Sequence, residues 1–248
     1  MSDLIRFVRG LANRVLPGAA VDGSYADIRV SQRGEQVVHS LWGSRLHGFA
    51  DEGSMLLAMN PTPGTAIAGI AAPTAFADTS ALMYMRQSPT STKRLYLLDL
   101  ELGVEAAGTS STNWNVVMKT DRGNSRYSSG GSVITPVNAN PSSALASEAS
   151  VYFGALTLAA ASSDARLIDH ERVQTVIKVI GSKYRFVFGD SSPGAPSGIP
   201  LEGTTQHARI IHCPPVVLGP GDAFAFHEFA ASQAAAATYQ FKARWIER

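Results

Sequence analysis

The sequence predicts a mainly β protein: an antiparallel β-sandwich of jelly-roll type, preceded by a short N-terminal helix and arm. Three observations lead to this prediction. Between Ser54 and Arg248, about nine or ten short segments are rich in apolar residues, and several of them alternate apolar and polar positions. Turn-forming Gly, Pro, Asn and Ser residues separate these segments. No long segment of this region has the apolar period of a helix, so a sandwich or jelly roll of eight main strands fits best.

The segment from Asp3 to Leu16 has the pattern of an amphipathic helix. Its apolar residues recur on one face, and its arginines lie off that stripe. Pro17-Gly18 ends the helix. A basic amphipathic helix either packs on its own domain or docks on a membrane surface or a partner. The candidate partner-binding residues are Leu4, Arg6, Val8, Arg9, Leu11 and Arg14.

Residues 1–48 are expected to form this helix and an extended arm, and residues 49–248 the sandwich. Within the arm, one or two short strands are expected around Arg33-Gly34. The segment from Leu41 to Phe49 fits a helix as well as irregular structure.

The first strands of the sandwich are expected at Met55–Met59, Ala81–Arg86, Arg94–Val104 and Trp114–Lys119, with a weakly alternating segment at Thr65–Ala72. The clearest of them places Leu98, Leu100, Leu102 and Val104 on one face, and Asp99 and Glu101 on the other. The breaker Asn60-Pro61-Thr62-Pro63-Gly64 ends the first strand.

Two Ser/Gly/Pro-rich stretches, Thr120–Ser150 and Gly189–Gly203, are predicted to be long loops of the kind that is usually functional or an ordered excursion. Strands are expected between and after them at Val151–Leu158, Val173–Ile180, Tyr184–Phe188 and Ala208–His212.

The last part of the chain predicts two strands joined through a spacer. Val216-Val217-Leu218 runs into the turn Gly219-Pro220-Gly221-Asp222, and the strand after it places Phe224 and Phe226 on one face. The final strand has Tyr239, Phe241, Ala243 and Trp245 on its buried face, with Gln240, Lys242, Arg244 and Glu247 pointing mostly the other way.

Composition limits the classes of function. Of 248 residues, 17% are charged, with 21 Lys and Arg against 20 Asp and Glu, so there is no basic footprint for a nucleic-acid backbone. A single cysteine, Cys213, excludes an internal disulfide and is expected to be buried. No apolar run approaches ~20 residues, and we expect a soluble chain made in the cytoplasm. The alanine-, serine- and glycine-rich composition suits packing against other subunits.

No catalytic, cofactor or metal site is predicted. The six histidines (His39, His47, His170, His207, His212 and His227) include no H-x-H pair, and neither G-x-S-x-G nor a phosphate-binding G-x-x-x-x-G-K occurs. Asp99 and Glu101 could act as a glycosidase pair, but they are more simply explained as the solvent-exposed face of their strand. Ser128–Ser132 is expected to be loop, and Trp42, Trp114 and Tyr127 fit either a sugar-stacking surface or the core.

Two regions together resemble structural proteins of tailed bacteriophages. The first joins the apolar strand Ala81–Arg86, the loop Ser88-Pro89-Thr90-Ser91-Thr92-Lys93 and the leucine-alternating strand Arg94–Leu102. In the second, Pro220-Gly221 leads into a strand, and the chain finishes on an aromatic-rich strand with Trp245-Ile246-Glu247. The likeness covers most of residues 50–104 and 214–248. Where the family has Asn-Pro before the Ser-x-Lys element, this chain has Ser88-Pro89.

The resemblance implies a non-enzymatic jelly-roll virion protein, a capsid decoration or cement protein that stabilises the phage head lattice. Its implied partners are further copies of itself in a homotrimer and the major capsid protein, with no nucleic acid, no membrane and no cofactor. Its implied location is the capsid surface of the virion, after synthesis in the host bacterial cytoplasm. Two alternatives stay open: a receptor- or carbohydrate-binding module of a phage fibre or tail, whose long loops would bind surface glycans, and a cupin-like metal enzyme.

Overall fold

The computed structural model describes residues 27–30, 36–39, 45–71, 73–108, 112–123, 125–174, 178–189, 198–200, 207–231 and 235–248. Its contacts divide the chain into two units, Met1–Asp51 and Glu52–Arg248. The predicted helix Asp3–Leu16 lies outside the described residues, and so do all of its candidate partner-binding residues: Leu4, Arg6, Val8, Arg9, Leu11 and Arg14.

The first unit contains a small hairpin and a short helix. β1 (Asp27–Val30) pairs antiparallel with β2 (Gln36–His39), which confirms the short strands expected around Arg33-Gly34. α2 (Arg45–Asp51) shows that the ambiguous segment Leu41–Phe49 is helical from residue 45 onward. Within the described part of the chain, no helix is long and apolar enough to cross a membrane.

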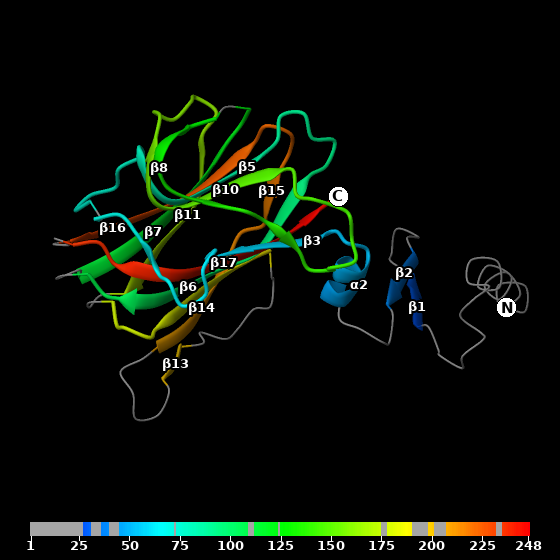
Figure 1. The fold of residues 1–248 in the computed structure, drawn as a ribbon, viewed down its shortest axis with the longest axis horizontal. Helices are drawn as coiled ribbons and strands as arrows, with labels where there is room; N and C mark the ends of the chain where they lie inside the picture. The colour runs from blue at the N-terminus through cyan, green and yellow to red at the C-terminus, as the bar shows by residue number, and fades with distance from the viewer. Residues whose placement is uncertain are drawn as a thin grey trace, which may run out of the picture. The chain divides into compact units, whose positions relative to one another are not determined.

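The second unit is built from two sheets (Figure 1). The six-stranded sheet has the order β11 (Arg166–Gln174), β7 (Thr112–Asp121), β16 (Ala223–Ala231), β5 (Ser80–Gln87), β10 (Ala149–Leu158) and β8 (Tyr127–Ile134). The nine-stranded sheet has the order β13 (Gly198–Pro200), β14 (His207–Cys213), β12 (Lys183–Phe188), β6 (Leu95–Ala106), β17 (Thr238–Glu247), β3 (Met55–Met59) and β9 (Val137–Asn138). In addition, β15 (Val216–Leu218) pairs with β6, and β4 (Ile67–Ala68) pairs with β17.

Eight of these strands pair in a nested order. In chain order they are β3, β5, β6, β7, β11, β12, β16 and β17. The first pairs with the last, the second with the seventh, the third with the sixth and the fourth with the fifth, always antiparallel. Among the described pairs, only β12 with β14 runs parallel. The chain therefore forms one long antiparallel hairpin whose four successive strand pairs alternate between the two sheets.

The core lies between the sheets and is held by aromatic contacts that cross from one sheet to the other. Phe224 and Phe226 of β16 make edge contacts with Phe188 and Phe186 of β12, with ring centroids 5.6 and 5.0 Å apart. Phe153 of β10 stacks on Phe241 of β17. Large aromatic side chains dominate core energetics because each buries roughly 150–250 Å². A mainly β, antiparallel-rich sandwich with Phe224 and Phe226 on one buried face is thus confirmed.

The predicted long loop Thr120–Ser150 is wrong in part, because the segment contains β8 and β9. β8 includes the Ser128–Ser132 cluster and forms the edge of the six-stranded sheet beside β10. Its glycines reflect close backbone approach: a Cβ at Gly130 would lie 2.2 Å from the carbonyl oxygen of Ala155, and Gly130 has a φ of 85°. The composition that indicated a loop therefore belongs to an edge strand packed against a bulged neighbour.

Three smaller predictions also need correction. The strand expected at Val173–Ile180 instead ends at Gln174, and a turn lies at Ile180–Gly181, whereas β11 begins at Arg166. β11 could not be recognised in the sequence, because two register shifts against β7 remove its period-two alternation of apolar and polar residues. Leu98 is not on the face of Leu100, because it lies at a bulge where β6 shifts register against β17. Glu247 does not point outward but is buried.

Candidate functional site

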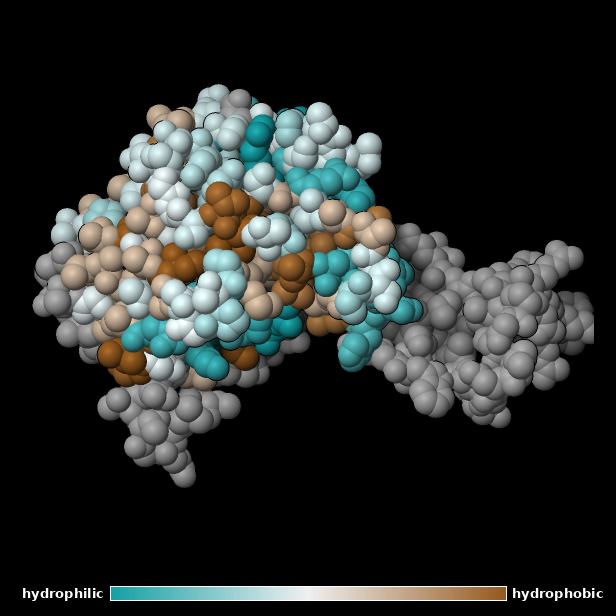
Figure 2. Space-filling model, viewed as in Figure 1, coloured by the Kyte–Doolittle hydropathy of each residue, from teal (hydrophilic) through white to brown (hydrophobic). Residues whose placement is uncertain are grey.

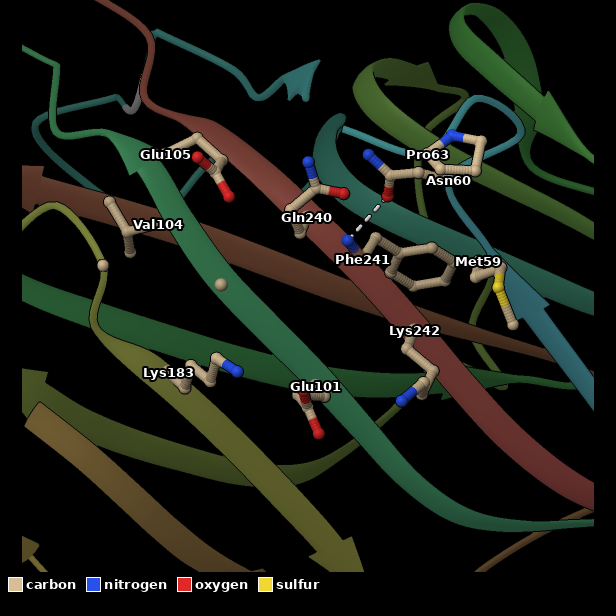
Figure 3. A pocket seen from close by; sticks show the side chains of 12 residues that line it. Met59, Asn60, Pro63, Glu101, Val104, Glu105, Lys183, Gln240, Phe241 and Lys242 are labelled. Carbon is tan, nitrogen blue, oxygen red and sulfur yellow. Dashed lines mark hydrogen bonds between the residues drawn. The ribbon is translucent and has the colours of Figure 1, made fainter. Parts of the chain in front are cut away.

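The nine-stranded sheet has a hollow of about 340 Å³ on its outer face, the face that turns away from the core (Figure 3). Gly103 of β6 lies in its centre. On the neighbouring strands Gly103 is opposite Lys183 of β12 and Gln240 of β17. Glu101 lies two residues before Gly103 on the same face, and Glu105, at a register shift of β6 against β17, also lines the hollow. Four polar side chains therefore surround a position that has no side chain, and this gap makes the hollow.

One rim of the hollow comes from β3 and the turn that follows it. Met59, Pro63 and Lys242 line this side, and Met59 is 43% exposed. The buried side chain of Asn60 fixes the turn: its Oδ1 accepts from the Phe241 N–H at 2.6 Å, and its Nδ2 donates to the carbonyl oxygens of Thr65 and Tyr239. The breaker that ends the first strand in the sequence is thus held rigidly against β17.

The charged groups of the hollow are not hydrogen-bonded or ion-paired to any residue that the structure describes, although the Glu101 charge adds to the effect of Asp99 in raising the pKa of nearby Arg244. Within the described residues, no hydrogen bond or ion pair engages the side chains of Glu101, Glu105, Lys183, Gln240 or Lys242. They provide two carboxylates, two ammonium groups and one amide, so the formal charges balance. The apolar contribution is the exposed side of Met59 and Pro63.

Next to the hollow on the same outer face, Asp99 is fully engaged. Arg185 Nη2 donates to Asp99 Oδ2 at 2.6 Å, Arg244 Nε donates to Oδ1 at 2.8 Å, and Arg244 Nη2 also pairs with Oδ2. The Asp99 side chain is buried. Asp99 and Glu101 do share a face, but two arginines donate hydrogen bonds to the first carboxylate, whereas Glu101 acts on Arg244 only through its charge. They therefore do not form a matched acid–base pair.

A second polar cluster lies inside the sandwich. Glu228 Oε2 accepts from Lys178 Nζ at 2.7 Å, from Tyr239 Oη at 2.7 Å and from Trp114 Nε1 at 2.9 Å. Lys178 also donates to Tyr239 Oη and lies over the Trp114 ring at 4.6 Å from its centroid. Burial raises the pKa of Tyr239, and the Glu228 charge adds to this. All four side chains are fully buried, so the cluster is structural, and Trp114 belongs to the core.

A third cluster lies on the outer face of the six-stranded sheet. Asp78 accepts from Lys119 Nζ at 2.5 Å and from Arg126 Nη2 at 2.7 Å. Burial by itself raises the pKa of Asp78, but the Lys119 hydrogen bond and the charges of Arg126 and Lys119 outweigh burial and lower it.

His227 is buried beside this cluster. Burial lowers its pKa to about 4, against the opposing effects of the Ser80 carbonyl at 2.8 Å from Nδ1 and the charge of Asp78. A neutral imidazole beside a carbonyl oxygen carries its proton on Nδ1. The ring packs edge-on against Phe76, 5.3 Å between centroids. His227 therefore supports the segment around Phe76, and Glu228, its neighbour in sequence, points to the opposite face.

The Ser88–Lys93 loop and the Pro220-Gly221 turn lie against each other. The Gly221 N–H donates to the carbonyl oxygens of Gln87 and Ser88, each at 3.2 Å, and the Gln87 N–H donates to the Asp222 carbonyl at 3.0 Å. Gln87 is buried, and its Nε2 donates to Ser91 Oγ at 2.8 Å. The Ser88–Lys93 loop and the Pro220-Gly221 turn are thus one structural unit.

No protein-family model, curated protein or solved structure matches this chain.

The remaining candidate residues are distributed as follows. Trp42 lies outside the described residues, and so does the predicted loop Gly189–Gly203 except for Gly189 and residues 198–200, which form β13 and not a loop. Tyr127 stacks on Tyr152 with centroids 3.8 Å apart, on the outer side of the six-stranded sheet. Cys213 is buried as predicted, and burial raises its thiol pKa. No group of three metal-ligating side chains occurs among the residues that the structure describes.

The sequence analysis missed the hollow. The one available signal was Gly103, a glycine on the polar face of the clearest strand with a glutamate two residues away on each side. A glycine inside a strand often marks a close approach of another group. Lys183 and Gln240 could not be assigned to it because only the strand register brings them there.

Proposed function

We propose that this chain is a non-enzymatic structural protein of a tailed-bacteriophage virion, a decoration or cement protein that binds and stabilises the head lattice as a homotrimer. In this proposal the sandwich is a jelly roll, and residues 1–48 form an arm that reaches a neighbouring subunit.

The nested strand pairing supports the jelly-roll assignment. A jelly roll is a double-sheet fold of eight antiparallel strands that together form two Greek keys. Such a fold can be described as one long antiparallel hairpin with four strands in each arm, wrapped so that successive strand pairs fall in alternate sheets. This chain has four such pairs: β3 with β17, β5 with β16, β6 with β12 and β7 with β11. β8 and β10 then extend the six-stranded sheet as an insertion between β7 and β11.

The observation that carries the virion proposal is the contact between the two segments with the phage-like pattern. They lie about 130 residues apart in the chain, yet the Gly221 turn makes backbone hydrogen bonds with both Gln87 and Ser88. A likeness confined to two segments that fold against each other is more specific than a likeness of scattered strands. The fold alone would not support this function, since sandwiches have many roles.

The surface of the second unit suits subunit contacts. Its exposed apolar side chains are Met59, Phe76, Tyr96, Val133, Val137, Leu145, Leu167, Ile180, Ile210 and Val217. Figure 2 shows apolar groups gathered in several patches between hydrophilic ones on the visible face. Interfaces of stable complexes have such an apolar centre with a polar rim.

The first test is the absolute mass of the purified protein in solution, measured by light scattering after size exclusion. We expect a mass near three times 26.2 kDa. The second test is co-sedimentation with phage heads that lack the protein, comparing the full chain with a chain that lacks its first twenty residues. We expect the shortened chain to bind more weakly while its far-ultraviolet circular dichroism stays that of a folded β protein. Heads that do not bind the full chain would refute the proposal, and unchanged binding of the shortened chain would refute the role of the arm.

A second candidate function is a receptor- or carbohydrate-binding module of a phage fibre or tail. The observation that favours it is the hollow around Gly103, and not the long loop Thr120–Ser150, since that segment contains β8 and β9.

A further inference from the structure

The hollow around Gly103 is built on paired strands and a fixed turn. β6 forms its floor, and on either side of Gly103 it pairs antiparallel with Lys183 of β12 and Gln240 of β17. Asn60 holds the rim through three hydrogen bonds to the backbone. Its volume of about 340 Å³ falls within the range of small-ligand sites, about 300–1,000 Å³. A site on paired strands loses little conformational entropy when a ligand binds.

The side chains that line the hollow indicate the chemistry of the ligand. Glu101 and Glu105 only accept hydrogen bonds when ionised, Lys183 and Lys242 only donate, and Gln240 does both. A ligand that meets all five must both donate and accept at closely spaced positions, which is what a row of hydroxyl groups does. The two negative and two positive charges cancel, so the site has no net charge to attract an acidic or a basic ligand.

The polar side chains of the hollow differ in their hydrogen bonding from Asp99, which lies on the same face of the sheet. Asp99 lies on the same strand two residues from Glu101, and it is saturated by Arg185 and Arg244. The five polar side chains of the hollow make no hydrogen bond or ion pair within the described residues. Met59 and Pro63 give the rim an apolar side against which the C–H face of a sugar ring can pack.

We propose that the hollow around Gly103 binds a neutral saccharide, with Glu101, Glu105, Lys183, Gln240 and Lys242 as its hydrogen-bonding groups. This proposal rests on the second candidate function and is independent of capsid binding. A decoration protein that also binds a cell-surface glycan would combine capsid binding and saccharide binding. If the saccharide assay fails, the capsid-binding proposal is unaffected, and if the capsid assay fails, the saccharide proposal is unaffected.

The test uses Gly103→Val, which fills the hollow without breaking the strand. Gly103 does not have a positive φ, and a Cβ there would lie 3.5 Å from Gln240 Cβ, an ordinary contact. Valine is also favoured in strands. The matched control is Ala208→Val. Ala208 is exposed and pairs directly with Lys183, so it lies on the same face and in the same row, but it does not line the hollow.

The full-length protein and both variants are applied to an array of immobilised neutral, amino and acidic saccharides, and each hit is titrated by calorimetry. We expect the wild-type protein and Ala208→Val to bind the same neutral saccharide, and Gly103→Val to lose affinity by more than about tenfold. Gln240→Ala should weaken binding in the same direction. Three results would overturn the proposal: no saccharide bound by the wild-type protein, equal binding by Gly103→Val, or binding only of acidic saccharides.

Discussion

Replacing Lys178 by methionine should destabilise the sandwich strongly, because it would leave a carboxylate without a cation in the core. Lys178 Nζ lies 2.7 Å from Glu228 Oε2, and both side chains are fully buried. Methionine keeps the length and apolar stem of lysine but removes the charge and three donors. Trp114 and Tyr239 would still donate to Glu228, but neither is a cation.

The expected loss is about 3–5 kcal/mol in the free energy of unfolding, the usual cost of removing one partner of a buried ion pair. The double variant Lys178→Met with Glu228→Gln should recover more than half of this loss. The amide oxygen of glutamine can accept from Trp114 and Tyr239, and no charge remains uncompensated. What the double variant still lacks is the two hydrogen bonds that Lys178 donates to Glu228 and Tyr239, together worth about 1–2 kcal/mol.

The assay is equilibrium unfolding in guanidinium chloride, followed by circular dichroism at one fixed protein concentration, since subunit association would shift the midpoint. Lys242→Met is the matched control. Lys242 is partly exposed on the outer face of β17 and has no protein partner within the described residues, so we expect a change within about 0.5 kcal/mol. If Lys178→Met also stays within that range, or if the double variant is less stable than the single one, the account of this cluster is wrong.

Two further predictions concern buried polar side chains. The pKa of His227 is lowered from 6.5 to about 4, so its contribution to stability is complete above pH 6.5 and is lost as the pH falls towards 4, because the unfolded chain takes up the proton first. The loss amounts to at most about 3 kcal/mol, and urea unfolding between pH 7 and 4 should show it in the wild-type protein but not in His227→Gln; identical profiles would contradict the assignment. Asn60→Ala should cost about 2–3 kcal/mol in the same assay at pH 7, since it leaves the Phe241 N–H without its acceptor. Asn60→Asp should cost at least as much, since it keeps that acceptor but turns a carboxylate towards two carbonyl oxygens, and a neutral result for either variant would contradict the role of Asn60.

The strands that could be predicted are those whose side chains alternate without interruption. β16 and β17 place Phe224, Phe226, Phe241 and Trp245 towards the core at period two, and the sequence shows this directly. β11 was not predicted, because two register shifts against β7 break the alternation of buried and exposed side chains. β8 was not predicted as a strand, because its glycines, which look like loop residues in the sequence, are needed for close packing against β10. Bulges and edge strands are set by contacts between distant segments, so local sequence patterns do not report them.

The candidate site could not be predicted for a related reason. Asp99 and Glu101 look equivalent in the sequence, two acidic residues on one strand face. The structure makes them different, because Arg185 and Arg244 converge on the first from both neighbouring strands. Likewise Glu228 and His227 are adjacent, yet one joins the core cluster and the other packs under Phe76. The cross-strand register therefore decides which polar side chains form hydrogen bonds and ion pairs and which do not.

Three buried polar side chains of this sandwich share one arrangement: each fixes a loop to a strand. Gln87 donates to Ser91 in the Ser88–Lys93 loop. Glu247 accepts from Ser147 Oγ and from the Glu148 N–H ahead of β10. Asn60 fixes the turn after β3 in the same way. Because leaving such a group unpaired costs about 1–3 kcal/mol, these loops are held in one conformation by the strands beneath them. Ordered loops on a rigid sandwich give a fixed surface, and a partner that binds such a surface loses little conformational entropy from the loops.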